Sequence, residues 1–128
     1  MIVLDASVLI AHLDASDAHH DRAFDLLHQL TEEPLAASPL TLAEVLVGPA
    51  RAGLLDRAAA ALHQLEVGSV PLEEDAPVRL AMLRAGTGLK LPDCCVLLAA
   101  EQAHATLATF DDRLAAAARD RGLGVRGR

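Results

Sequence analysis

Four acidic residues interrupt apolar stretches of the sequence, and carboxylates are the side chains from which proteins build magnesium sites. Asp5 separates the aliphatic runs of MIVLDASVLI. Glu44 lies within LTLAEVLVG, Asp93 opens PDCCVLLAA, and Asp111 follows TLATF. A buried carboxylate without a partner costs several kcal/mol or gives up its charge. Such residues are therefore expected only where a ligand or a bonding partner compensates.

A shared site would explain all four acids at once. Three or four carboxylates in one cleft stay ionised only if a cation neutralises them. An all-oxygen site suits Mg²⁺ or Mn²⁺, whereas Zn²⁺ prefers histidine and cysteine ligands. Such an ion generates hydroxide from bound water and stabilises charge on a phosphate, so the pattern favours phosphoryl transfer without a separate histidine base.

Each acid also has an ordinary structural explanation, in which its carboxylate serves a helix end, a turn or an ion pair. The explanations are an N-cap for Asp93, Asp111 or Asp112, a bond to the N–H groups of the next turn for Asp5, and an ion pair with Arg51 or Arg79 for Glu44. Taken together, the four favour a shared site, because the order of elements brings at least two of them to one edge.

Short apolar segments alternate with helical patterns along the chain. The predicted strands are Ile2–Asp5, Leu35–Ser38, Val67–Leu72, Thr106–Thr109 and Leu123–Val125. The predicted helices are Val8–Leu13, Ser16–Glu33, Ser38 to a break or kink at Gly48-Pro49, Leu54–Leu65, Glu73–Gly88, Pro92–Ala105 and Asp111–Gly122. This pattern predicts an α/β fold with a parallel sheet of four to five short strands flanked by helices. Asp5 and Asp111 each follow a strand, so both are expected at the carboxyl edge, where such sheets bind ligands.

Composition limits the class of protein. The 128 residues suffice for one domain, residues 1–128, and no apolar run approaches the roughly 20 residues of a membrane span. No basic region precedes the apolar start, and Cys94 and Cys95 are neighbours, so we expect a cytoplasmic protein without a signal peptide. The net charge of −7 argues against a general nucleic-acid binder, although RDRGLGVRGR holds four of the eleven basic residues. An acidic protein can still bind a nucleic acid if some of its acidic residues belong to a metal site.

The stretches IVLDASVLIAHL, TLAEVLVG and KLPDCCVLLAAEQAHATLATFDD resemble the motifs of PIN domains, specifically of VapC-like toxins from bacterial toxin–antitoxin pairs. The resemblance extends from Ile2 to about Gly124 and rests on the ordered set of four acids with the motifs LPD and TFD. It implies a PIN-like three-layer fold. It also implies an Mg²⁺-dependent endoribonuclease, with Mn²⁺ as an alternative ion, that leaves a 5′-phosphate.

The same resemblance implies roles and partners. The family's metal-binding and catalytic acids match Asp5, Glu44, Asp93 and Asp111, and its supporting positions match Ser7, Thr109 and, one residue after the fourth acid, Asp112. Ser7 and Thr109 would orient the acids, and Asp112 could share or take the role of Asp111. The implied partners are an RNA substrate, a cognate antitoxin and a second copy of the chain in a homodimer. The antitoxin is expected to direct an Arg or Lys side chain at the acids.

Three other functions share parts of this pattern. A haloacid-dehalogenase-like phosphatase would need a second aspartate two residues after Asp5, where Ser7 stands. A phospho-accepting receiver domain would need a lysine near the last strands, but the only lysine, Lys90, precedes Asp93. A non-catalytic PIN-fold interaction module would be favoured if one of the four acids were missing. The six histidines lack ligand spacing, and the cysteines are expected to be buried and inert.

Overall fold

The structure, a computed structural model, describes residues 1–128 and is organised around one parallel sheet. The strands are β1 (Ile2–Leu4), β2 (Leu35–Ala37), β3 (Gly68–Ser69), β4 (Thr106–Ala108) and β5 (Val125–Arg126). They lie in the order β3-β2-β1-β4-β5, and every neighbouring pair is parallel. The predicted α/β class with a short-stranded parallel sheet is therefore confirmed.

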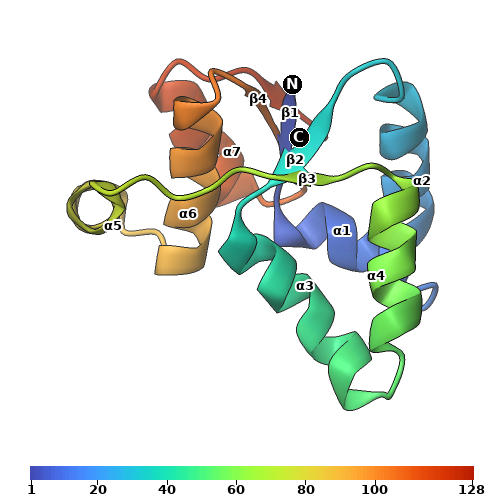
Figure 1. The fold of residues 1–128 in the computed structure, drawn as a ribbon. Helices are drawn as coiled ribbons and strands as arrows, with labels where there is room; N and C mark the ends of the chain where they lie inside the picture. The colour runs from blue at the N-terminus through green and yellow to red at the C-terminus, as the bar shows by residue number, and fades with distance from the viewer.

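Seven helices cover the two faces of the sheet (Figure 1). They are α1 (Ala6–Leu13), α2 (His20–Gln29), α3 (Pro39–Arg51), α4 (Leu55–Gln64), α5 (Ala76–Thr87), α6 (Leu91–Gln102) and α7 (Asp112–Asp120). Helices α1 to α4 lie on one side, and α5, α6 and α7 lie on the other. None of the seven is long and apolar enough to cross a membrane.

The sheet divides the buried apolar residues into two cores. Ile2 and Leu4 of β1 belong to the core shared with α1 and α2, whereas Val3 belongs to the core built on α6. This alternation follows from strand geometry, because successive side chains point to opposite faces. A sheet buried on both faces explains why its central strands are predominantly apolar.

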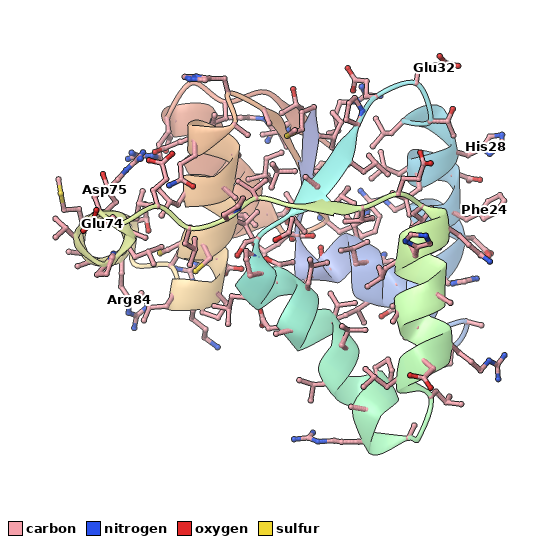
Figure 2. All side chains as sticks on the ribbon, viewed as in Figure 1. Phe24, His28, Glu32, Glu74, Asp75 and Arg84 are labelled. Atoms are coloured by element: carbon pink, nitrogen blue, oxygen red, sulfur yellow. The ribbon has the colours of Figure 1, made fainter.

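Helix α2 shows how a helix face is matched to the core. Ala23, Leu26 and Leu27 are buried, as their spacing predicts. Phe24 and His28 lie one turn apart on the outer face, where their rings stack and Phe24 is 57% exposed (Figure 2). One of the two phenylalanines is thus outside the core.

Several predicted boundaries are wrong, two of them for clear local reasons. Of the break or kink predicted at Gly48-Pro49, the break is wrong, because α3 continues to Arg51. The proline lacks only its own N–H, and its carbonyl accepts from Leu54 N at 2.8 Å. The helix predicted from Ser16 starts only at His20, since aspartate side chains bind backbone N–H groups in the preceding turns. The strand predicted over Val67–Leu72 is reduced to Gly68–Ser69.

Candidate metal centre

The carboxyl ends of three strands lie along one edge of the sheet, and a helix begins just beyond each. Leu4 of β1 pairs with Ala108 of β4, and the N–H of Asp5 donates to the Ala108 carbonyl at 3.1 Å. Asp5 is the N-cap of α1, Ser38 that of α3, and Asp111 that of α7. Three helix N-termini, each the positive end of a helix dipole, therefore face this edge. As predicted, Asp5 and Asp111 share it.

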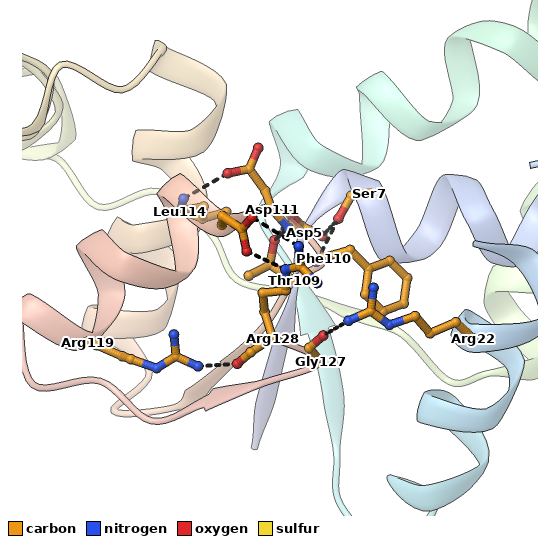
Figure 3. A network of polar contacts seen from close by, with 11 residues as sticks. Asp5, Ser7, Arg22, Thr109, Phe110, Asp111, Leu114, Arg119, Gly127 and Arg128 are labelled. Atoms are coloured by element: carbon orange, nitrogen blue, oxygen red, sulfur yellow. Dashed lines mark hydrogen bonds and ion pairs between the residues drawn. The ribbon is translucent and has the colours of Figure 1, made fainter. Parts of the chain in front are cut away.

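Asp5 is held from three sides although it is only 4% exposed. Its Oδ1 accepts from Ser7 Oγ at 2.7 Å and from Val8 N at 3.1 Å, and its Oδ2 accepts from Thr109 Oγ1 (Figure 3). Burial raises the pKa of Asp5 and outweighs these hydrogen bonds, and the charge of Asp93 raises it further. The carboxylate is thus fixed in position but short of countercharge.

The two hydroxyl groups also tie the ends of β1 and β4 together. Ser7 Oγ accepts from Phe110 N at 3.1 Å, and Thr109 Oγ1 accepts from Asp111 N at 2.9 Å. Each hydroxyl donates to Asp5 and accepts from the loop that leads into α7 (Figure 3). This arrangement suits the orienting role expected for Ser7 and Thr109.

The four acids act on one another electrostatically. Burial raises the pKa of Glu44, and the charges of Asp93 and Asp5 add to the effect. Burial also raises the pKa of Asp93, and the charge of Asp111 adds to it. Glu44 is exposed on α3, and Asp93 is half-buried in the first turn of α6. Neither carboxylate accepts a hydrogen bond from another side chain or from the backbone. These two acids keep their oxygens free for a ligand.

Two of the ordinary explanations for these acids are wrong. Lys90, not Asp93, is the N-cap of α6. Arg79 pairs with Glu101 at 3.2 Å, so it does not neutralise Glu44, and Arg51 forms no ion pair. For Asp5 and Asp111 the capping explanation holds, and both residues still take part in the cluster.

The two neighbouring aspartates at the start of α7 have different surroundings. Asp111 Oδ1 accepts from Leu114 N at 2.9 Å, and its charge acts on Asp93. The Asp112 side chain is 74% exposed and pairs with Arg128, whose hydrogen bond lowers the pKa of Asp112. The structure therefore associates Asp111 with the other acids and turns Asp112 toward the end of the chain.

The donor set fits Mg²⁺ or Mn²⁺ by its chemistry. In this structure no three His, Cys, Asp or Glu side chains stand close enough to enclose an ion together. Mg²⁺ does not need such a cage, because it keeps several waters and commonly binds through one or two carboxylates and the substrate phosphate. Burial raises the pKa of the Cys94 and Cys95 thiols, so no thiolate ligand competes. A divalent cation would relieve the repulsion that, in addition to burial, raises the pKa of Asp5, Glu44 and Asp93.

The basic residues near the end of the chain mostly serve contacts within the chain. Arg121 pairs with Glu101, Arg128 pairs with Asp112, and Arg119 donates to the Arg128 carbonyl. Two other cations, Lys90 and Arg113, act on Asp93 through their charges, although neither was predicted from the sequence to belong to the site. Their closeness in sequence to the predicted acids could have identified them. Lys90 lies three residues before Asp93, and Arg113 lies two residues after Asp111.

Several known proteins are similar to this chain. The family model of the PIN domain matches residues 2–120. A toxin-antitoxin complex from Klebsiella pneumoniae contains a chain that is similar with 25% identity over 91% of each chain and a TM-score of 0.70. FitAcB from Neisseria gonorrhoeae is 24% identical over 98% of this chain and 96% of its own, with a TM-score of 0.74. VapC20 from Mycobacterium tuberculosis, a sarcin-ricin loop cleaving toxin, is 19% identical over 91% of this chain and 95% of its own, with a TM-score of 0.68. No curated protein sequence matches significantly.

Proposed function

Because the chain belongs to the PIN domain family, we propose that it is a metal-dependent endoribonuclease and the toxin of a toxin–antitoxin pair that acts in the cytoplasm. The observation that carries the proposal is the edge of the sheet where Thr109 links the buried Asp5 to Asp111, with Asp93 and Glu44 near enough for their charges to act on the group. Asp93 acts on Asp5 and Glu44, and Asp111 acts on Asp93. A toxin-antitoxin complex and a sarcin-ricin loop cleaving toxin among the similar structures support it.

Each residue has a proposed part in phosphodiester hydrolysis. A bound Mg²⁺ or Mn²⁺ would supply an activated water and stabilise charge on the phosphate. Asp5, which Ser7 and Thr109 hold in place, provides a preorganised ligand. Asp93 and Glu44 keep free oxygens that can bind the ion directly or through water. Asp111 holds the N-terminus of α7 and adds negative charge, which favours cation binding.

The metal requirement tests this function directly. RNA incubated with the protein should be cleaved internally in Mg²⁺ or Mn²⁺, and EDTA should lower the rate by roughly a hundredfold or more, since the ion supplies several kcal/mol of stabilisation. Zn²⁺ should not replace Mg²⁺, because the site offers only oxygen ligands. The measurement is gel electrophoresis of end-labelled RNA, with the 5′-phosphate detected by a phosphate-dependent exonuclease. Cleavage that survives EDTA, or a phosphorylated enzyme intermediate, would contradict the proposal.

A groove beside Glu44 supports the proposed antitoxin partner. It has a volume of about 410 Å³ and lies between α1, α3 and the turn that leads from α3 into α4. Its lining includes Ile10, Leu13, Val45, Pro49 and Leu54, with Glu44 and Asp14 as its acids. An apolar peptide segment that carries one cationic residue matches this combination, because that residue would reach carboxylates short of countercharge.

Exposed apolar residues of α3 and α5, among them Val47, Val78 and Met82, support the proposed homodimer.

Co-production with the product of the neighbouring reading frame should give a soluble complex that does not cleave RNA. A basic side chain of the partner would compete with Mg²⁺ for the carboxylate oxygens. Replacing that basic residue by glutamine should restore cleavage at high Mg²⁺ while the complex remains assembled. Light scattering after gel filtration measures the assembly, and the RNA assay measures activity. An assembled complex as active as the free protein would rule out this mode of inhibition.

A further inference from the structure

Two cationic side chains beside the acids have no ion-pair partner. Lys90 is the N-cap of α6, three residues before Asp93, and Arg113 lies two residues after the α7 N-cap Asp111. Both side chains are exposed, and both act electrostatically on Asp93. The ion pairs of the chain are Arg79 and Arg121 with Glu101, and Arg128 with Asp112. Lys90 and Arg113 therefore remain available for an external anion.

Arg113 also lines a groove of about 540 Å³ between α5 and α7. On the α7 side, Arg113, Ala116, Ala117 and Arg121 follow the spacing of one helix face, and Asp120 lies beside Arg121. The two arginines are eight positions apart, which corresponds to about 12 Å along the helix. The small side chains between them leave room along α7, and the end of this row nearest the acids is Arg113, whose charge acts on Asp93.

An RNA strand that approaches the four acids must overcome their charge. A metal ion neutralises carboxylates at the reacting phosphate but not the repulsion felt by the phosphates next to it. Arg and Lys side chains serve this purpose in nucleic-acid complexes, and the guanidinium group can bind a phosphate through two parallel hydrogen bonds. Neither phenylalanine lines the α5–α7 groove, so its lining favours contact with the RNA backbone over base stacking.

We infer that Lys90 and Arg113 bind backbone phosphates next to the one that is cleaved, and that the RNA strand continues along the α5–α7 groove. This inference rests on the proposed ribonuclease function and extends it to how the substrate is held. Because backbone contacts carry no base information, this part of the site fixes the position of the strand without selecting its sequence.

The salt dependence of RNA binding tests the two contacts. A short fluorescently labelled single-stranded RNA of mixed sequence is titrated with the protein in Ca²⁺, and anisotropy gives the Kd at several salt concentrations. Arg113→Gln and Lys90→Gln should each weaken binding by roughly fivefold to tenfold and reduce the slope of log K against log salt by about 0.7. Arg113→Lys should keep the slope. Arg119→Gln, which removes the same charge from α7 outside the groove, should leave both values unchanged.

The contrasting outcomes separate this inference from the proposed function. If the glutamine variants keep the affinity and slope of the unsubstituted protein and change only the Mg²⁺ concentration needed for cleavage, the two cations act on Asp93 alone and the inference is overturned. Absence of RNA binding by the unsubstituted protein would also overturn it. Failure of the unsubstituted protein to cleave any RNA in Mg²⁺ would instead refute the proposed ribonuclease.

Gly86 allows the groove to be tested separately. It lines the α5 side, and an added Cβ would meet no atom within 4 Å, so a side chain can start there without a clash. Gly86→Glu should weaken RNA binding severalfold by charge repulsion, whereas Gly86→Gln should retain more of the affinity. Equal affinities for both variants would exclude the groove as the path of the strand. A change of oligomeric state in both variants would show that a second copy of the chain covers the groove, which would also overturn the path.

Discussion

Replacing Asp93 by asparagine should abolish metal-dependent RNA cleavage while the protein stays folded. The loss should be roughly a hundredfold or more, because one carboxylate of the proposed ion site becomes a neutral amide. Folding should survive, since the Asp93 side chain accepts no hydrogen bond and does not cap α6. Cleavage rates and a far-UV circular dichroism spectrum measure the two effects.

The stability of the metal-free Asp93→Asn variant should equal or slightly exceed that of the unsubstituted protein. Burial and the charge of Asp111 raise the pKa of Asp93 in the folded chain, so the ionised carboxylate destabilises the fold above that pKa. Its place in the first turn of α6 offsets part of this cost through the helix dipole. The net gain should be within about 1 kcal/mol at neutral pH and should vanish below about pH 3.9, where the unfolded carboxyl is also protonated.

Metal binding supplies the matching control. Mg²⁺ should raise the Tm of the unsubstituted protein, because a ligand that binds only the folded state stabilises it, and should raise the Tm of Asp93→Asn much less. Asp25→Asn makes the same chemical change on the exposed surface of α2 and should alter neither cleavage nor the Mg²⁺ response. An Asp93→Asn variant that unfolds with or without metal would show that the residue has a structural role.

Local patterns were sufficient for the architecture of the chain. The short apolar segments Ile2–Asp5 and Thr106–Thr109 predicted parallel strands, and the sheet confirms both, each one residue shorter. Because parallel strands share a direction, the order of strands and helices alone placed the residues that follow them, Asp5 and Asp111, at one edge. Boundaries were less predictable where side chains compete for backbone groups, as Asp14 and Asp17 do before α2.

Contacts between residues distant in sequence could not be predicted in this way. No local pattern shows that Thr109 donates to Asp5 across 104 positions. The partner of Arg79 is Glu101, 22 positions away, and only the tertiary structure excludes Glu44 as the alternative. The sequence therefore predicted four acids and, through the resemblance, Ser7 and Thr109 as residues that orient them. The individual hydrogen bonds to Asp5, and the absence of such bonds at Glu44 and Asp93, required the fold.

The two aspartates at the start of α7 should differ strongly when each is replaced by asparagine. Asp111→Asn should lower RNA cleavage by roughly tenfold to a hundredfold, because it removes a charge that acts on Asp93 and would help to hold the cation. The fold should tolerate the change, since asparagine caps a helix about as well as aspartate and can still accept from Leu114 N. Asp111→Ala should lose the cap as well, at a further cost of about 1 kcal/mol in stability.

Asp112→Asn provides the matched comparison one residue away. The exposed Asp112 carboxylate pairs with Arg128, so its removal should leave cleavage within about twofold and change the stability of the fold very little, because solvent screens such surface pairs. Cleavage rates over a range of Mg²⁺ concentrations distinguish the variants, because only Asp111→Asn should need more Mg²⁺ for half-maximal activity. Equal losses in both variants would mean that the two aspartates act jointly, and a larger loss in Asp112→Asn would transfer the role of fourth acid to Asp112.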